Sequence, residues 1–192
     1  MHHHTLKAGI VILAAALSLS AAHADEAAML EQARSVASAI PPKLLNMLTE
    51  EIAKGGTDGA IAVCREKAPQ MAKAASEQSG WNIRRVSLKN RNPKALPDAW
   101  EQAVLQDFDA RAKAGEPAAK LERGEVVADG GGKSYRYMKA LPTNELCMNC
   151  HGPAERIAPA VKARLHELYP DDKAVGYAPG EIRGAITLKR PL

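Results

Sequence analysis

The sequence predicts an α+β fold, with helices first and a small antiparallel sheet after them. Apolar residues recur at helical spacing through the first third of the chain, whereas short strand-like stretches bounded by glycine and proline follow residue 80. Two of these stretches flank a run of three glycines, which is a strong hairpin signal. Helices followed by strands, without regular alternation between them, are typical of this class.

Residues 1–24 have the features of a secretory signal peptide. Lys7 supplies a positive charge, residues 8–19 form an apolar run too short to span a bilayer, and Ala22-His23-Ala24 fits a small-x-small cleavage site. We therefore expect cleavage after Ala24 and export of residues 25–192 as one domain. No later segment is long and apolar enough to be a membrane anchor, so a periplasmic protein without a membrane span is expected.

The first helices are expected to follow the cleavage site directly. A helical pattern covers residues 25–54, and Pro41-Pro42 is expected to divide it into two helices. Gly55-Gly56 should end the second, and a third at about 57–79 carries Cys64 among apolar neighbours. The remaining elements are expected as a strand at 81–88, a polar loop at 89–93, a helix from about 97 to 115, a hairpin of 121–129 and 134–141, a helix at 157–168 and a last strand at 182–189.

The segment Cys147-Met148-Asn149-Cys150-His151 has the attachment pattern of a c-type haem. Each thiol adds to one vinyl group of the porphyrin, and one helical turn sets the two sulfurs at the right separation. His151, next to the second thioether, then offers its imidazole to the iron as an axial ligand. The pattern predicts one covalent haem c per chain.

The two cysteines have two other interpretations. A zinc site would need two further ligands, for which only Cys64 and His166 remain after the predicted signal peptide. A redox-active pair would be expected after a strand and in a cytosolic or folding-factor context. Neither suits the sequence as well as haem does.

The second axial position of the iron has several candidates. Cys64 ranks first, because it is an unpaired thiol in a compartment that oxidises spare thiols, and iron would hold it as thiolate. Met71 or Met138 ranks next, and an open position ranks last. The alternative for Cys64 is a purely structural role, as a buried, inert cysteine that packs as a small hydrophobic residue.

A basic cluster lies at the predicted strand and loop, with Arg84, Arg85, Lys89 and Arg91. These side chains can simply be solvated. Alternatively, one or two of Arg84, Arg85 and Arg91 bind the haem propionates, because a planar guanidinium matches a carboxylate.

Four stretches occur in order along the chain: 62–69, 83–93, 147–152 and 176–186. Together they resemble a family of exported single-haem c proteins with a PAS-like domain, and the resemblance covers nearly the whole chain after Ala24. It implies a PAS-like antiparallel sheet with N-terminal helices, and a haem ligated by histidine and cysteine. The distal cysteine then falls on Cys64. Members fused to signalling modules imply sensing, although no such module occurs in this sequence.

The expected function is that of a redox or gas sensor, or of an electron carrier, without turnover of its own. A redox partner protein and a small gas such as NO or CO are the expected partners. The alternative is a haem c enzyme that oxidises sulfur compounds such as thiosulfate, although a second haem motif, which such enzymes commonly carry, is absent from the sequence. The net charge of +4 makes no case for nucleic acid, and no triad or phosphate loop is evident.

Overall fold

The structure, a computed structural model, describes residues 7–192, with side chains from Ala24 onward. Residues 1–6 of the predicted signal peptide lie outside the described residues. The helices are α1 (Lys7–Gly59), a π-helical turn η1 (Val63–Lys67), α2 (Ala68–Ser79), α3 (Ala99–Lys113), α4 (Glu145–His151) and α5 (Pro159–Leu168), with short 3-10 turns η2 (Pro93–Ala95), η3 (Ala118–Lys120) and η4 (Ala154–Arg156). The strands are β1 (Asn82–Val86), β2 (Glu122–Asp129), β3 (Gly132–Pro142) and β4 (Ile182–Pro191).

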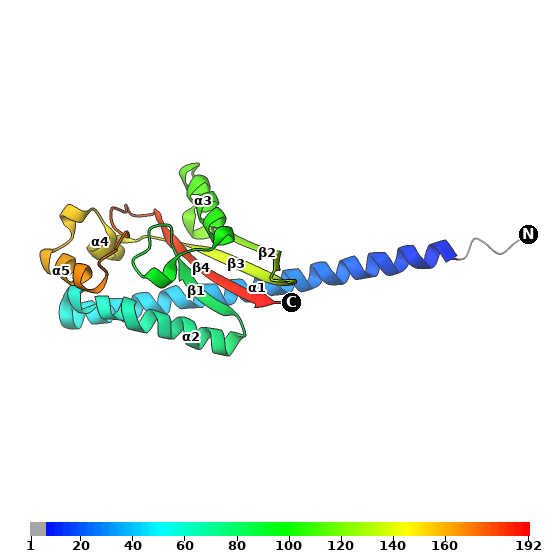
Figure 1. Cartoon of the computed structure of the whole chain (residues 1–192), viewed down its shortest axis with the longest axis horizontal. Coiled ribbons are helices and arrows are strands. Elements are labelled where there is room, and N and C mark those ends of the chain that lie inside the picture. Colours follow the sequence, from blue (N-terminus) through cyan, green and yellow to red (C-terminus); the bar gives the residue numbers. More distant parts are fainter. Residues whose placement is uncertain (1–6) are drawn as a thin grey trace, which may run out of the picture.

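The four strands form one antiparallel sheet in the order β1-β4-β3-β2. Helix α3 covers one face, while α1 and α2 run along the other, and α4 and α5 lie together at one end of the sheet (Figure 1). The prediction of an α+β fold with N-terminal helices and an antiparallel sheet is confirmed. The last strand in the sequence, β4, lies between β1 and β3 and pairs with both.

Helix α1 continues through Pro41 and Pro42, so the predicted division at these prolines is wrong. Each proline removes a backbone donor and costs about 3 kcal/mol in a helix interior. Packing on both sides of the prolines offsets this cost. Residues up to Ile40 pack on the sheet beside the buried Ala33 and Ala37, and residues beyond it line a pocket. The helical geometry breaks only at Gly56, whose φ of 77° suits glycine.

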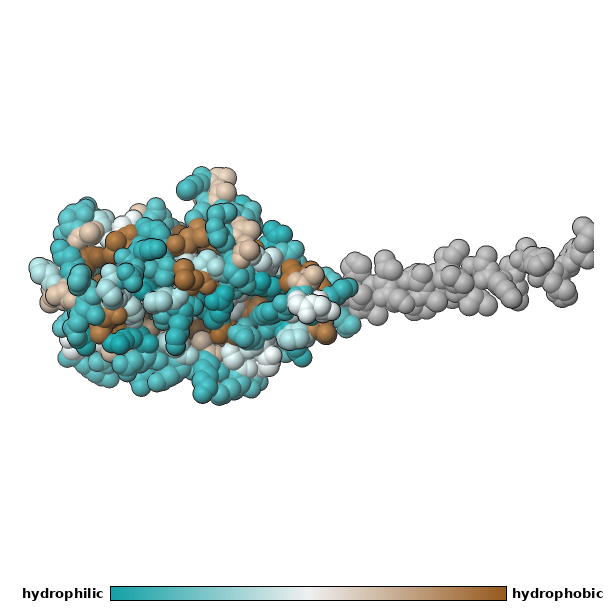
Figure 2. Space-filling model, viewed as in Figure 1, coloured by the Kyte–Doolittle hydropathy of each residue, from teal (hydrophilic) through white to brown (hydrophobic). Residues whose placement is uncertain are grey.

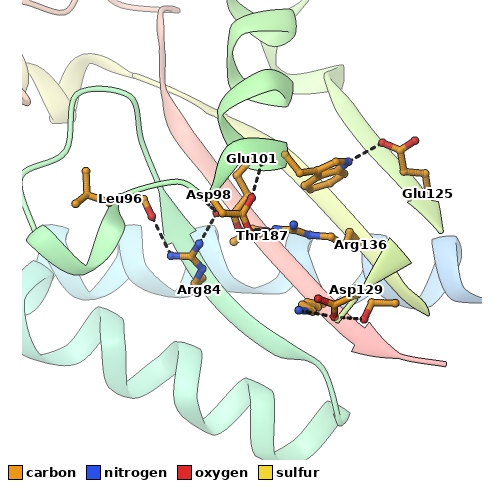
Figure 3. A network of polar contacts seen from close by, with 11 residues as sticks. Arg84, Leu96, Asp98, Glu101, Glu125, Asp129, Arg136 and Thr187 are labelled. Atoms are coloured by element: carbon orange, nitrogen blue, oxygen red, sulfur yellow. Dashed lines mark hydrogen bonds and ion pairs between the residues drawn. The ribbon is translucent and has the colours of Figure 1, made fainter. Parts of the chain in front are cut away.

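The α3 face of the sheet closes around a buried carboxylate, that of Glu101, which is 1% exposed. Its Oε1 accepts a hydrogen bond from Thr187 Oγ1 at 2.9 Å and forms an ion pair with Arg136 Nη2 at 3.1 Å. Its Oε2 accepts from Arg84 and from the Asp98 amide. Figure 3 shows these contacts joining three strands to the first turn of α3. Phe108, Met138 and Leu105 belong to the apolar cluster on the same face. The ion pairs therefore fix α3 on the sheet.

Strand β4 contains an irregularity that reverses which way its first residues face. Ala140 of β3 pairs with Ala185, but Pro142 pairs with Ile182, so β4 has one extra residue at this point. Gly184 lies there with a φ of 150°, and a Cβ on it would come within 2.2 Å of the Val86 carbonyl oxygen. Ile182 consequently joins the α3-side core, and Arg183 lines the pocket on the α1 side.

The visible surface of the domain is mostly hydrophilic, with apolar residues in separate small spots (Figure 2). Leu88, Leu96 and Leu192 are large apolar side chains that are exposed. Among residues 7–192, no helix combines the length and the apolar character needed to cross a bilayer.

Replacing Glu101 with alanine should lower the free energy of unfolding by about 3 kcal/mol, because Arg84 would lose its carboxylate partner and Arg136 would keep only Asp98. Urea denaturation of the purified protein measures this change. Glu116→Ala is the control, because Glu116 forms an exposed ion pair with Arg111. A loss for Glu101→Ala as small as that of the control would contradict the role given to this carboxylate.

Candidate functional site

A large pocket opens between α1, η1, the end of the sheet and α4. It contains about 1290 Å³ of space between atoms, part of which is open to solvent. One wall is an apolar row from the second half of α1, made of Ile40, Leu44, Leu45, Leu48 and Ile52. The opposite wall carries Cys147, Cys150 and His151, so the three residues of the attachment motif come together at the pocket.

Helix α4 presents the two cysteines one turn apart. It begins at Asn144, whose Oδ1 accepts a hydrogen bond from the Cys147 amide at 3.2 Å. The Cys147 thiol also lies 3.2 Å from this oxygen. Because residues i and i+3 share a helix face, Cys147 and Cys150 both line the pocket. The capped helix thus provides the geometry that the spacing predicted.

His151 is held in one orientation by its neighbours. Its Nδ1 lies 2.7 Å from the Ala174 carbonyl oxygen, which can only accept, so Nδ1 carries the proton. The edge of Tyr177 packs against the imidazole, with 6.4 Å between ring centroids. Burial lowers the pKa of His151 well below its usual value, and the nearby charges of Arg183 and Arg91 lower it further. The ring is therefore neutral, and its Nε2 is a free electron-pair donor.

The environment of Cys150 argues against a redox-active pair. Burial raises the pKa of its thiol to about 11, so the thiol stays protonated at neutral pH. Redox-active cysteines instead have a lowered pKa, since the thiolate is the reactive form. The zinc interpretation also loses a ligand, because His166 lies exposed on α5 and is not among the residues that line the pocket.

An ion pair between Arg91 and Asp172, which we call the Arg91 clamp, joins the motif to the loop behind it. Arg91 Nε donates to Asp172 Oδ2 at 2.9 Å, and the two side chains are 9% and 12% exposed. Arg91 Nη2 donates to the carbonyl oxygens of Cys150 at 2.6 Å and Ala174 at 3.3 Å. Asp172 Oδ1 accepts from the Ala174 amide at 2.8 Å. The clamp therefore places the carbonyl group that orients His151.

Cys64 lies on the π-helical turn η1 and lines the pocket. The Cys64 side chain is exposed, so Cys64 is not a buried, inert core cysteine. Met138 is fully buried in the core on the α3 face, and Met71 is not among the residues that line the pocket. Of the side chains considered for the second axial position, the structure brings only Cys64 to the pocket. Single π-turns are frequent at functional sites.

The three arginines of the predicted basic cluster have different surroundings. Arg84 pairs with Glu101 on the α3 face, and Arg91 belongs to the clamp. Arg85 lines the pocket, and its buried Nε has no hydrogen-bond partner among the described residues. Arg183 also lines the pocket, and its buried Nε likewise has no hydrogen-bond partner among the described residues. No pattern in the sequence indicates this position for Arg183. Plain alternation along β4 would have placed Arg183 on the other face of the sheet, and nothing in the sequence reveals the extra residue that turns it.

Comparisons with known proteins agree on one group. A family model described as Tll0287-like matches residues 15–191. The crystal structure of the cyanobacterial heme-protein Tll0287 superposes with a TM-score of 0.56 at 25% sequence identity, covering 78% of this chain and 91% of that one. A search of the curated proteins found no match.

The Arg91 clamp can be tested by a double-mutant cycle. Arg91→Ala and Asp172→Ala should each cost about 3–5 kcal/mol of unfolding free energy, because each leaves a buried charge without its partner. The double variant should cost clearly less than the sum of the two. The exposed pair Arg164 and Glu167, 2.6 Å apart, is the matched control, and we expect about 0–1 kcal/mol for it. Additive costs at Arg91 and Asp172 would show that the two side chains act independently.

Proposed function

Because this chain belongs to the Tll0287-like family, we propose that its pocket holds one haem c, bound covalently through Cys147 and Cys150. The observation that carries the proposal is the joint placement of Cys147, Cys150 and a neutral His151 at one large pocket with an apolar wall. The heme protein Tll0287 shares the fold over most of both chains. Burial of a porphyrin needs apolar surface of this kind, together with a few well-placed polar groups.

In this proposal, Nε2 of His151 and the sulfur of Cys64 would be the two protein ligands of the haem iron. The first assignment is supported by the hydrogen bond of Nδ1 to Ala174, because an imidazole that binds a metal usually donates its other N–H to a fixed acceptor. The second is supported by the position of Cys64 on η1 at the same pocket. The bound haem would supply a one-electron redox centre, and a thiolate opposite histidine favours its ferric form.

For the propionates, Arg85 is the arginine of the predicted cluster that we retain. Arg84 and Arg91 already have carboxylate partners in Glu101 and Asp172. Arg85 has no ion pair or side-chain hydrogen bond with another described residue, and it lines the pocket. A half-buried arginine without a partner among the described residues suits an anionic group of the cofactor.

We further propose that the protein is exported, loses its signal peptide after Ala24 and acts in the periplasm as a redox or gas sensor or as an electron carrier. If reduction of the haem iron released the Cys64 sulfur, one side of the pocket would open to a small gas such as NO or CO. The segment that carries Cys64 would then shift relative to α1. A redox protein of the same compartment would exchange electrons with it.

Attachment is tested by removing the thiols one at a time. Cys147→Ala and Cys150→Ala should each deplete covalently bound haem, because each thioether holds one side of the porphyrin. Haem absorbance that survives denaturation and acid–acetone extraction measures this. Cys64→Ser should retain the full amount, because it leaves both thioethers in place. Parent protein that keeps no haem after extraction would refute covalent attachment.

The distal ligand is tested by Cys64→Ser in the haem-loaded protein. The charge-transfer band between thiolate and iron should disappear, the midpoint potential should rise because the strongest electron donor is gone, and CO should bind faster. Met71→Leu is the matched control and should change none of these, since Met71 does not line the pocket. An unchanged ferric spectrum and an unchanged midpoint potential in Cys64→Ser would show that Cys64 does not bind the iron.

A further inference from the structure

Two arginines at the pocket stand apart from the other arginines that the structure describes. Arg85 on β1 and Arg183 on β4 are half-buried, and the Nε of each is buried without a hydrogen-bond partner among the described residues. Neither guanidinium forms an ion pair within that part of the chain. Of the other arginines without an ion pair there, Arg65 and Arg156 are exposed to solvent, and Arg190 donates a hydrogen bond to Gln32 Oε1 at 2.8 Å. The environment of Arg85 and Arg183 therefore needs a separate explanation.

Both side chains reach the pocket through specific features of the sheet. Arg85 pairs with Ile186 across β1 and β4, and both residues face the α1 side. Arg183 reaches the same side because β4 carries its extra residue at Gly184. The positive φ of Gly184 and its close approach to the Val86 carbonyl leave no room for a side chain. The fold thus accommodates an unusual backbone at the position that turns Arg183 inward.

Two like charges that lie close together and are partly buried are unfavourable without a counter-charge. Burial, together with the nearby charges of Arg85 and Arg91, lowers the pKa of Arg183 to about 9. Burial also lowers the pKa of Arg85. Arg91 is neutralised by Asp172, so it needs no further anion. Arg85 and Arg183 therefore need two negative counter-charges, and no carboxylate of the described residues supplies them.

We propose that Arg85 and Arg183 together form the receptor for the two haem propionates, one guanidinium for each carboxylate. This inference rests on the proposed function, and it adds Arg183 and the two-to-two pairing. The ligand chemistry fits, because a planar guanidinium binds a carboxylate through two parallel hydrogen bonds. The position fits as well, because both arginines line the pocket that contains Cys147, Cys150 and His151. The two positive charges of the guanidinium groups would balance the two negative charges of the carboxylates.

The test compares Arg85→Gln, Arg183→Gln and the double variant with the parent, all purified with covalent haem. Resonance Raman spectra report the bending modes of the propionates, and potentiometric titration reports the midpoint potential. Each single variant should shift the bending mode of one propionate. Each should also lower the potential, because a positive charge near iron favours the ferrous form. Arg156→Gln, an exposed charge loss on η4, is the control and should change neither quantity.

A single variant with full haem content and a parent-like Raman spectrum would show that the replaced arginine does not bind a propionate. That result would overturn the two-arginine receptor. A parent without covalent haem would instead overturn the proposed function. If a glutamine variant does not accumulate, Arg183→Lys or Arg85→Lys decides the matter. Lysine keeps the charge but not the paired hydrogen bonds, so the bending mode should shift while the potential falls less than with glutamine. An unshifted mode in both lysine variants would contradict the proposal.

Discussion

The site depends on the Arg91 clamp more than on any other interaction. Arg91 lies in a loop after β1, Cys150 lies in α4, and Asp172 and Ala174 lie in the segment before β4, so one guanidinium connects three distant parts of the chain. Water is largely excluded from this ion pair, which makes its hydrogen bonds strong and the loss of either partner costly. Through Ala174 the same interaction sets the ring orientation and the tautomer of His151.

The two faces of the sheet divide structural and functional tasks. On the α3 face, the charges of Arg84 and Arg136 are neutralised by Glu101 and Asp98, and the apolar core around Phe108 is closed. On the α1 face, the sheet continues into the pocket, where buried arginines lack partners within the described chain. Charges are therefore satisfied internally where the protein must be rigid. They are left available where we propose that a cofactor completes the structure.

Much of this could be predicted from the sequence, because local patterns determine it. The strands, the hairpin glycines and the capped helix of the motif follow from alternation, turn chemistry and spacing. Three features could not be predicted. Helix α1 continues through its prolines because of tertiary packing, Arg183 turns inward because of one extra residue in β4, and the Arg91 clamp depends on contacts across about eighty residues. Each depends on contacts between residues far apart in the sequence, which local propensity does not describe.

The central claim is that His151 and Cys64 hold one haem iron between them at this pocket. The most direct measurement is the absorption and electron paramagnetic resonance spectrum of the purified ferric protein. The account predicts a low-spin ferric signal together with a charge-transfer band from thiolate to iron. A haem spectrum without that band, or a high-spin ferric signal, would contradict ligation by Cys64, and the absence of haem absorbance would contradict the assignment of the pocket itself.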